Sequence, residues 1–181
     1  MEDRFIEDSV KKRLVEAGLS ELMEHGVADF SLRRVAIAAQ VSCAAPYRHF
    51  KDKDELIRAV AVSIRDDWYL IAHQVSEVYK YGRREHVLEL ILTYARFWIG
   101  GGNFVSLLNA GMLEGFDEPI LDAVIAYADL TLCDKGAVTS LFSGLLALTY
   151  GTVALVAQGA MTPVAAVDML RIRTMDILSK G

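Results

Sequence analysis

The stretch from Ser31 to Phe50 reads SLRRVAIAAQVSCAAPYRHF, and it decides how the chain is interpreted. Ser31 can cap a short helix whose inward face carries apolar residues at helical spacing, namely Leu32, Val35, Ala36 and Ala39. Val41 then fills a tight turn, and Ser42 is expected to cap a second short helix containing Tyr47 and Phe50. Two short helices joined by so brief a turn cross steeply. The stretch therefore predicts a helix-turn-helix whose second helix is sized for the DNA major groove.

The charge of this stretch supports the same interpretation. Between residues 31 and 53 the only acidic residue is Asp52, against five basic ones: Arg33, Arg34, Arg48, Lys51 and Lys53. The segment thus carries a net charge of +4 in a chain whose formal net charge is −5. Phosphate neutralisation depends on where positive charge sits rather than on the total. A charge cluster alone would indicate only a solvated helix face, but its position on a helix-turn-helix favours DNA binding.

The rest of the chain is also expected to be helical. An apolar stripe from Ile6 to Leu22 ends at Gly26, a good helix stop. A long helix is expected from Lys53 to about Tyr81, closed by Gly82. Further helices are expected near residues 85–99, 104–114, 119–132, 136–158 and 163–178, and no strand is expected. The expected fold class is all-α.

Bulk composition and residue spacing argue against several other classes of protein. The chain has 181 residues, of which 53% are hydrophobic and 24% are charged, so it can bury a core and is not expected to be disordered. Cys43 and Cys133 form no disulfide or metal pattern, which fits a cytoplasmic protein. The N-terminus is charged from Glu2 onward, so no secretory signal is expected.

Sites for metals, cofactors and catalysis are not expected either. His25, His73 and His86 have no partners at metal-ligand spacing. The glycines at 100–102 are not followed by the lysine of a phosphate-binding loop, and no nucleophile triad stands out. We therefore expect no metal, no cofactor and no enzymatic activity.

Residues 14–61 resemble the DNA-binding domain of the TetR family of helix-turn-helix transcriptional regulators. Gly26 ends the first helix, Ser31 opens the second, and Val41-Ser42 forms the turn. The run Tyr47-Arg48-His49-Phe50 is similar to the end of the family's recognition helix, and Lys53-Asp54-Glu55-Leu56 to the start of its fourth helix. The resemblance implies a DNA-binding domain over residues 1–52 and a C-terminal helical bundle over residues 53–181 for ligand binding and dimerisation.

Two positions depart from the family pattern. Gln40 stands where the family usually has glycine, so either a turn that needs positive φ is strained there or the turn differs slightly. Pro46 removes one backbone donor and is tolerable only near the first turn of a helix.

The resemblance also assigns roles to individual residues. Tyr47, His49 and Lys53 resemble the phosphate contacts of the family, and Arg48 is expected to reach a guanine or a phosphate. Side chains or backbone at the start of the recognition helix are expected to approach bases. The expected DNA-binding set is Ser31, Arg33, Ser42, Cys43, Ala44, Ala45, Tyr47, Arg48, His49 and Lys53. An oxidation-sensitive thiol at Cys43 remains an alternative to a merely small residue.

Large apolar side chains gather between Trp68 and Tyr127 and belong either to the bundle core or, as the resemblance implies, to a cavity for a mostly apolar small molecule. His73, Asn109 and Tyr127 are its candidate polar groups. The expected ligand-binding set is Trp68, His73, Phe97, Trp98, Phe104, Asn109, Met112, Phe116 and Tyr127.

A stripe of small residues marks the uncharged late helix: Ser143, Ala147, Gly151 and Ala154. Small residues let two helix backbones approach closely, either within one subunit or across a homodimer interface. We expect a homodimer on a pseudo-palindromic operator, released by its ligand. Two alternatives remain: a helical carrier of a hydrophobic molecule that binds no DNA, and a membrane-anchored protein, because residues 144–161 could span a bilayer by length.

Overall fold

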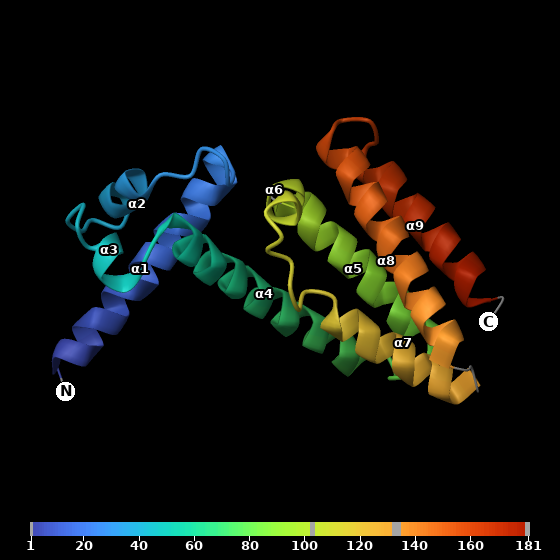
Figure 1. Ribbon diagram of the computed structural model, residues 1–181. Helices are drawn as coiled ribbons and strands as arrows, with labels where there is room; N and C mark the ends of the chain where they lie inside the picture. The colour runs from blue at the N-terminus through green and yellow to red at the C-terminus, as the bar shows by residue number, and fades with distance from the viewer. Residues whose placement is uncertain (1, 102–103, 132–134, 180–181) are drawn as a thin grey trace. The chain divides into compact units, whose positions relative to one another are not determined.

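The structure is a computed structural model that describes residues 2–101, 104–131 and 135–179. Over these ranges its regular secondary structure is helical and contains no strand, so the all-α prediction is confirmed (Figure 1). The chain divides into two compact units, each described separately below. The first comprises Met1–Asp66 and Ser106–Leu113, and the second comprises Asp67–Val105 and Glu114–Gly181.

The N-terminal unit is built from the first four helices and a short returning segment. These helices are α1 (Glu2–His25), α2 (Leu32–Ala38), α3 (Pro46–His49) and the first half of α4 (Lys53–Val78), joined by part of α6 (Phe104–Asn109). Gly26 adopts a φ of 68°, which ends α1 as the sequence predicts. Asp52 accepts a hydrogen bond from the Glu55 amide at 2.9 Å and so caps the start of α4.

The core of this unit is apolar and tightly packed. Its buried side chains come from α1, α2, α4 and the segments between the helices, and include Leu14, Leu22, Phe30, Val35, Phe50, Leu56 and Val60. Gly18 lies where α1 approaches α4, because a Cβ atom added there would lie 2.9 Å from Cγ2 of Val60. The lack of a side chain at Gly18 therefore sets the spacing of these two helices.

The C-terminal unit is a helical bundle. It contains the second half of α4, α5 (Arg84–Gly101), α7 (Glu118–Thr131), α8 (Lys135–Ala157) and α9 (Pro163–Leu178). Helix α5 packs against α7, α8 and α9, so it is the most enclosed helix of the unit (Figure 1). Gly82 (φ 76°) turns the chain between α4 and α5, and Thr162 caps α9.

The expected helix boundaries hold with modest differences. Helix α4 ends at Val78 rather than near Tyr81, and α6 ends at Asn109 rather than at residue 114. The expected end of the seventh helix at residue 132 and the position of Cys133 lie outside the described residues.

Candidate functional site

The turn that follows α2 has the geometry of a Schellman cap. The amide of Val41 donates to the carbonyl of Ala36 at 3.0 Å, and the amide of Gln40 donates to Ile37 at 3.0 Å. This pairing of hydrogen bonds requires the first residue after the helix cap to have a left-handed backbone. That residue is Gln40, and its φ is 55°. Of the two alternatives at this departure from the family pattern, the structure has the turn that needs positive φ. In this left-handed conformation a residue with a Cβ atom, such as Gln40, is less favourable than glycine by about 1 kcal/mol.

The recognition helix is shorter than the sequence predicts. Ser42 does not cap a helix; its backbone carbonyl accepts a hydrogen bond from Ala45 at 2.9 Å in a separate turn. Helix α3 begins only at Pro46 and has no side-chain cap. Proline suits this first position because it brings no amide that needs a partner. Phe50, expected within the helix, lies just after it in extended backbone and is buried.

The structure exposes most of the expected DNA-binding residues. Exposed positions are Arg33, Ser42, Cys43, Ala44, Tyr47 and Arg48, whereas Ser31, His49 and Lys53 are half-buried. Tyr47 has 65% of its surface exposed, so its hydroxyl is accessible to a phosphate. Ala45 is different because only 8% of its surface is exposed. Its methyl group packs inward, so of the two expected contacts with bases, through side chain or through backbone, only the backbone of Ala45 is available.

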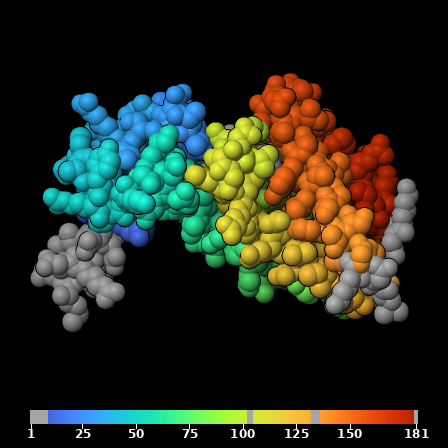
Figure 2. Space-filling view, viewed as in Figure 1, coloured from blue at the N-terminus to red at the C-terminus, as the bar shows by residue number. Residues whose placement is uncertain are grey.

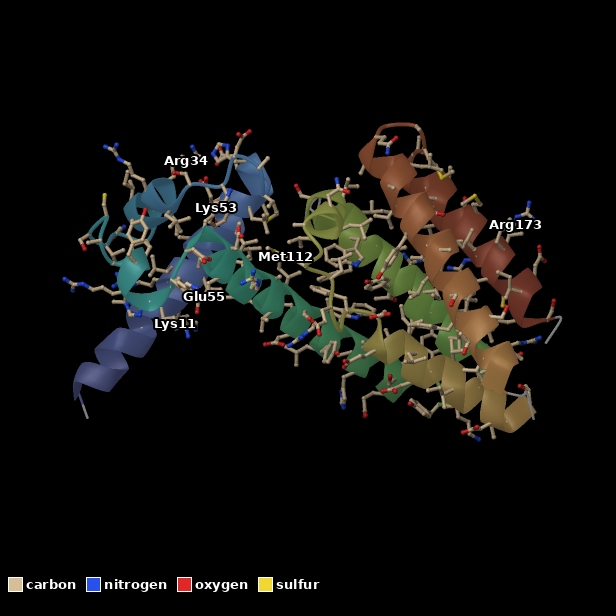
Figure 3. All side chains as sticks on the ribbon, in the orientation of Figure 1. Lys11, Arg34, Lys53, Glu55, Met112 and Arg173 are labelled. Atoms are coloured by element: carbon tan, nitrogen blue, oxygen red, sulfur yellow. The ribbon has the colours of Figure 1, made fainter. Side chains whose placement is uncertain are left out.

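Arg34 differs from its neighbour Arg33 because it is already engaged. Its Nε lies 2.8 and 3.0 Å from the two carboxylate oxygens of Glu21, and its terminal nitrogen also donates to the Asp29 carbonyl. Figure 3 labels Arg34 on α2. Glu21 lies outside the segment 31–53 in sequence but beside it in space. The positive charge that the segment can present to phosphates is therefore one less than the sequence count.

Two lysines also make contacts within the N-terminal unit (Figure 3). The ammonium group of Lys53 donates to the carbonyl of Val27 at 3.3 Å. Lys11 lies 5.8 Å from the centre of the Phe50 ring, a cation–π distance that ties α1 to the end of α3. These contacts hold the end of the recognition segment on α1 and the start of α4 on the turn that follows α1.

The interior of the C-terminal unit is a cluster of aromatic rings. Trp68 is fully buried, its ring centre lies 4.8 Å from that of Tyr94 at a tilt of 54°, and its Nε1 donates to the carbonyl of Phe116 at 2.8 Å. Trp98 lies 5.0 Å from the ring of Phe116. Phe97 adjoins Trp68 at 5.8 Å and is half-buried. The predicted aromatic ligand-binding residues Trp68, Phe97, Trp98 and Phe116 are thus brought together.

The other predicted ligand-binding residues do not join this cluster. The side chain of His73 is 74% exposed and lies beside Glu77, so the structure does not place it with the aromatic side chains. Asn109 is exposed, and both Asn109 and Met112 lie in the segment 106–113, which packs with the N-terminal unit. Tyr127 is buried, but its hydroxyl donates to the carbonyl of Leu178 at 2.7 Å. The side chain of Phe104 lies outside the described part of the structure.

Sequence reasoning missed two polar contacts in this interior. The hydroxyls of Tyr94 and Tyr150 lie 3.4 Å apart, joining α5 to α8, and burial raises the pKa of both. Tyr69 donates to the carbonyl of Gly115 at 2.7 Å, so α4 is bonded to the turn before α7 at both Trp68 and Tyr69. The signal available in the sequence was that these tyrosines occur at helical spacing from positions expected to be buried, where a hydroxyl needs a hydrogen-bond partner.

Helix α8 presents much of its surface outward (Figure 2). In the single chain, Ser143, Ala147 and Gly151 are exposed and Ala154 is half-buried. A Cβ atom added at Gly151 would meet no other atom within 4 Å. Among the described residues, no backbone of another helix therefore lies against the stripe at Gly151. Within the described residues, 136–157 of α8 is the one stretch long and apolar enough to span a membrane, and 22% of its most apolar part is buried.

Metal binding finds no cluster to support it in the part of the chain that the structure describes. No group of three or more His, Cys, Asp and Glu side chains there is placed to hold a metal ion. Cys43 is a free, exposed thiol.

Comparison with known proteins connects these features to a family. Residues 14–60 match the family model described as bacterial regulatory proteins, tetR family, so the resemblance predicted from the sequence is confirmed. The match contains the Schellman turn, α3 and the first residues of α4. No curated protein matches the sequence.

Solved structures share the fold over nearly the whole chain. A TetR-family regulator from Rhodococcus sp. superposes with a TM-score of 0.70 at 17% identity, covering 94% of this chain and 99% of its own. A TetR-family regulator from Streptomyces coelicolor gives 0.69 at 16% identity, covering 96% of both chains. The regulator FadR from Bacillus subtilis, solved with stearoyl-CoA, gives 0.64 at 13% identity, covering 93% and 97%. The fold of this chain is that of TetR-family transcriptional regulators.

Proposed function

We propose that this chain, with a TetR-type DNA-binding domain and the TetR-regulator fold, is a homodimeric repressor that a mostly apolar small molecule releases from its operator. The observation that carries the proposal is the exposed surface around α3. Tyr47 and Arg48 on this one-turn helix are exposed together with Lys51 directly after it. A hydroxyl and two cations so placed can bond to consecutive phosphates while the turn before α3 approaches base edges.

Selection of bound fragments from genomic DNA, followed by titration at several salt concentrations, tests this proposal. We expect one pseudo-palindromic duplex to be enriched. The logarithm of its association constant should fall with the logarithm of salt concentration by about 0.9 for each phosphate neutralised. Tyr47→Phe removes only the hydroxyl and should weaken binding to all duplexes alike, because phosphate contacts carry no sequence information. Cys43→Val lies in the turn before α3 and should alter site preference instead.

Two results would contradict DNA binding as the function. One is an affinity that does not change between low and moderate salt, and the other is the absence of any enriched site. Binding of hydrophobic molecules without salt-dependent DNA binding would instead support a carrier of such molecules.

The proposed dimer interface is the outer face of α8 together with α9. Three of its small residues, Ser143, Ala147 and Gly151, are exposed in the single chain. Exposed apolar side chains on the same two helices include Leu155 on α8 and Val164 and Ile172 on α9. Burying such a face against a second copy removes apolar surface from water, as stable homodimers do. A two-fold protein also matches a two-fold DNA site.

Gly151→Leu tests this interface. Because no atom of the same subunit lies near a Cβ at Gly151, leucine fits the single chain but overpacks a helix pressed against it from a second copy. We expect the wild type to sediment as a dimer at micromolar concentration and Gly151→Leu to shift toward monomer. Gly100→Leu is the matched control, because that glycine in α5 also has open space around it. A monomeric wild type, or a Gly151→Leu dimer as stable as the control, would overturn the interface.

Ligand release requires a connection between the two parts of the chain. Helix α4 starts in the N-terminal unit and continues into the C-terminal unit, where Trp68 and Tyr69 bond it to the turn before α7. A ligand that fits the aromatic interior better in one position of α4 shifts the population of that position. The same proposal assigns DNA binding to residues 1–52, ligand binding and dimerisation to residues 53–181, and a cytoplasmic location to the protein.

A further inference from the structure

Helix α1 bonds to both ends of α2. At the N-terminal end, the Glu21 carboxylate accepts the Ser31 amide at 2.9 Å and the two-pronged contact from Arg34. At the C-terminal end, Arg13 donates to the carbonyl of Ala39 at 3.4 Å. The order along the chain is opposite in the two helices, so α1 and α2 run antiparallel through these contacts.

The spacing of these contacts matches along the two helices. Glu21 and Arg13 are eight residues apart on α1, and Ser31 and Ala39 are eight residues apart across α2. At about 1.5 Å per residue, each pair spans about 12 Å. The signs also match the helix dipole, because the anion lies near the N-terminal amides and the cation at a C-terminal carbonyl. The two contacts therefore fix both the position and the direction of α2.

The ionised state of Glu21 determines how firmly its contacts with Ser31 and Arg34 are held. Its side chain is only 7% exposed. Burial acts to raise the pKa of Glu21, but hydrogen bonds from Arg34 and from the Ser31 amide outweigh it, and the pKa is lowered. The carboxylate is therefore ionised at neutral pH. A buried ion whose partner is removed is strongly unfavourable, so the pair holds its geometry.

The Ala39 end of α2 leads directly into the segment that faces DNA. The Schellman turn at Gln40 and Val41 follows Ala39 without an intervening residue, and α3 begins at Pro46. A change in the position of α2 therefore moves the whole segment 42–49. Arg34 and Arg33 are neighbours, but among the side chains that the structure describes a carboxylate holds Arg34 and none holds Arg33.

We propose that Glu21 is a specificity-determining positioning residue: by holding Ser31 and Arg34 it fixes α2 and the recognition segment, and it keeps Arg34 from serving as a phosphate contact. This inference rests on DNA binding as the proposed function. It assigns opposite roles to two adjacent arginines, since Arg33 contributes charge toward DNA and Arg34 contributes position.

Four variants of the full chain test the proposal: Glu21→Gln, Arg34→Gln, their double variant, and Arg33→Gln as the matched control. Each is titrated against the selected duplex and an unrelated duplex at several salt concentrations. We expect Arg33→Gln to weaken both duplexes and to lower the salt slope by about 0.9 per subunit. We expect Glu21→Gln and Arg34→Gln to weaken the selected duplex about tenfold while the unrelated duplex binds as tightly as before. Because the two residues act as one unit, the double variant should be no weaker than Glu21→Gln.

Loss of salt slope in Arg34→Gln equal to that in Arg33→Gln would overturn the proposal, because Arg34 would then be a phosphate contact. An unchanged ratio of selected to unrelated affinity in Glu21→Gln would overturn it as well. Circular dichroism checks that each variant is folded. If either single variant fails to fold, the double variant decides the question, because it removes both charges and leaves no unpaired ion buried.

Hydrogen exchange separates failure of this inference from failure of the proposed function. The amides of Val35 and Ala36 should exchange faster in Glu21→Gln than in wild type or Arg33→Gln, with or without DNA. Equal rates would overturn the positioning role. If the wild type enriches no duplex while exchange is accelerated, DNA binding has failed as the function, and the specificity role of Glu21 fails with it.

Discussion

The two units of this chain satisfy their polar groups in different ways. In the N-terminal unit, charged side chains bond to each other or to the backbone in partly buried positions, as Arg34 does with Glu21 and Lys53 with Val27. In the C-terminal unit, the polar tips of buried aromatic side chains bond to backbone carbonyls. Trp68 bonds to Phe116 in this way, and Tyr127 to Leu178.

This difference shows what each unit is suited to do. Charged groups at the surface of a small helical unit can exchange water for phosphate oxygens at little cost. Aromatic side chains with one polar tip form an interior that is apolar but has a few oriented hydrogen bonds, the usual composition of a small-molecule site. Substitutions in the C-terminal unit should therefore act on stability through burial.

The largest expected effect is that of Trp68→Ala in the aromatic interior. Trp68 is fully buried, and its removal leaves a cavity and an unpaired carbonyl at Phe116. Truncation of a buried tryptophan typically costs about 3–5 kcal/mol of unfolding free energy. Urea unfolding followed by circular dichroism measures this loss.

Leu70→Ala on the same helix is the matched control for Trp68→Ala. Leu70 is 66% exposed, so its truncation should change the unfolding free energy by less than about 0.5 kcal/mol. A loss for Trp68→Ala no larger than that for Leu70→Ala would show that the aromatic cluster does not hold this unit together.

The helix-turn-helix could be predicted from the sequence because its signals are local. Gly26 permits positive φ, Ser31 accepts the Arg34 amide, and the position of Gln40 takes the left-handed backbone that the turn needs. Ser42 misled the prediction because hydroxyl residues suit both caps and turns, and Pro46 starts the helix better. A local pattern does not distinguish these two uses of serine.

Contacts between distant segments could not be predicted in the same way. The role of Glu21 depends on α1 and α2 being antiparallel neighbours, so a charge count confined to residues 31–53 omitted it. The exposure of His73 could have been predicted from the sequence, because the helical spacing that places Trp68 and Val75 inward places residue 73 on the opposite face of α4. Which aromatic side chains bond to which carbonyls follows from packing and has no signature in the sequence.

The next expected effect is a pH dependence that arises in the C-terminal unit. His86 is fully buried, its Nε2 lies 2.9 Å from the hydroxyl of Ser76, and burial lowers its pKa. As pH falls below about 6.5, the unfolded chain binds a proton that the folded chain does not, so stability decreases until the lowered pKa of the folded state is passed. Above that range His86 is neutral in both the folded and the unfolded chain, so it contributes no pH dependence to the stability.

Urea unfolding of His86→Gln at pH 7.5 and pH 5.5 tests this effect. The difference in unfolding free energy between the two pH values should be smaller than in wild type. His73→Gln is the control, because the side chain of His73 is 74% exposed and its replacement should leave the difference unchanged. Equal pH dependence in wild type and His86→Gln would contradict the assignment.

The smallest expected effect is a gain in stability from removing one hydroxyl in α9. Thr174 is fully buried, and its Oγ1 has no hydrogen-bond partner among the described residues. Thr149 in α8 is equally buried, but its hydroxyl donates to the carbonyl of Leu145 at 2.7 Å. A buried hydroxyl without a partner is unfavourable, whereas a bonded one is close to neutral or favourable. Valine has nearly the same shape and the same branching at Cβ, so helix propensity does not change.

Thr174→Val should therefore raise the unfolding free energy by about 1 kcal/mol, and Thr149→Val should lower it by about 0.5–1 kcal/mol. Parallel urea titrations measure the pair under one condition. If Thr174→Val is instead the less stable of the two, a bound water or ligand satisfies that hydroxyl, and the interior around α9 is more polar than the comparison of the two units implies.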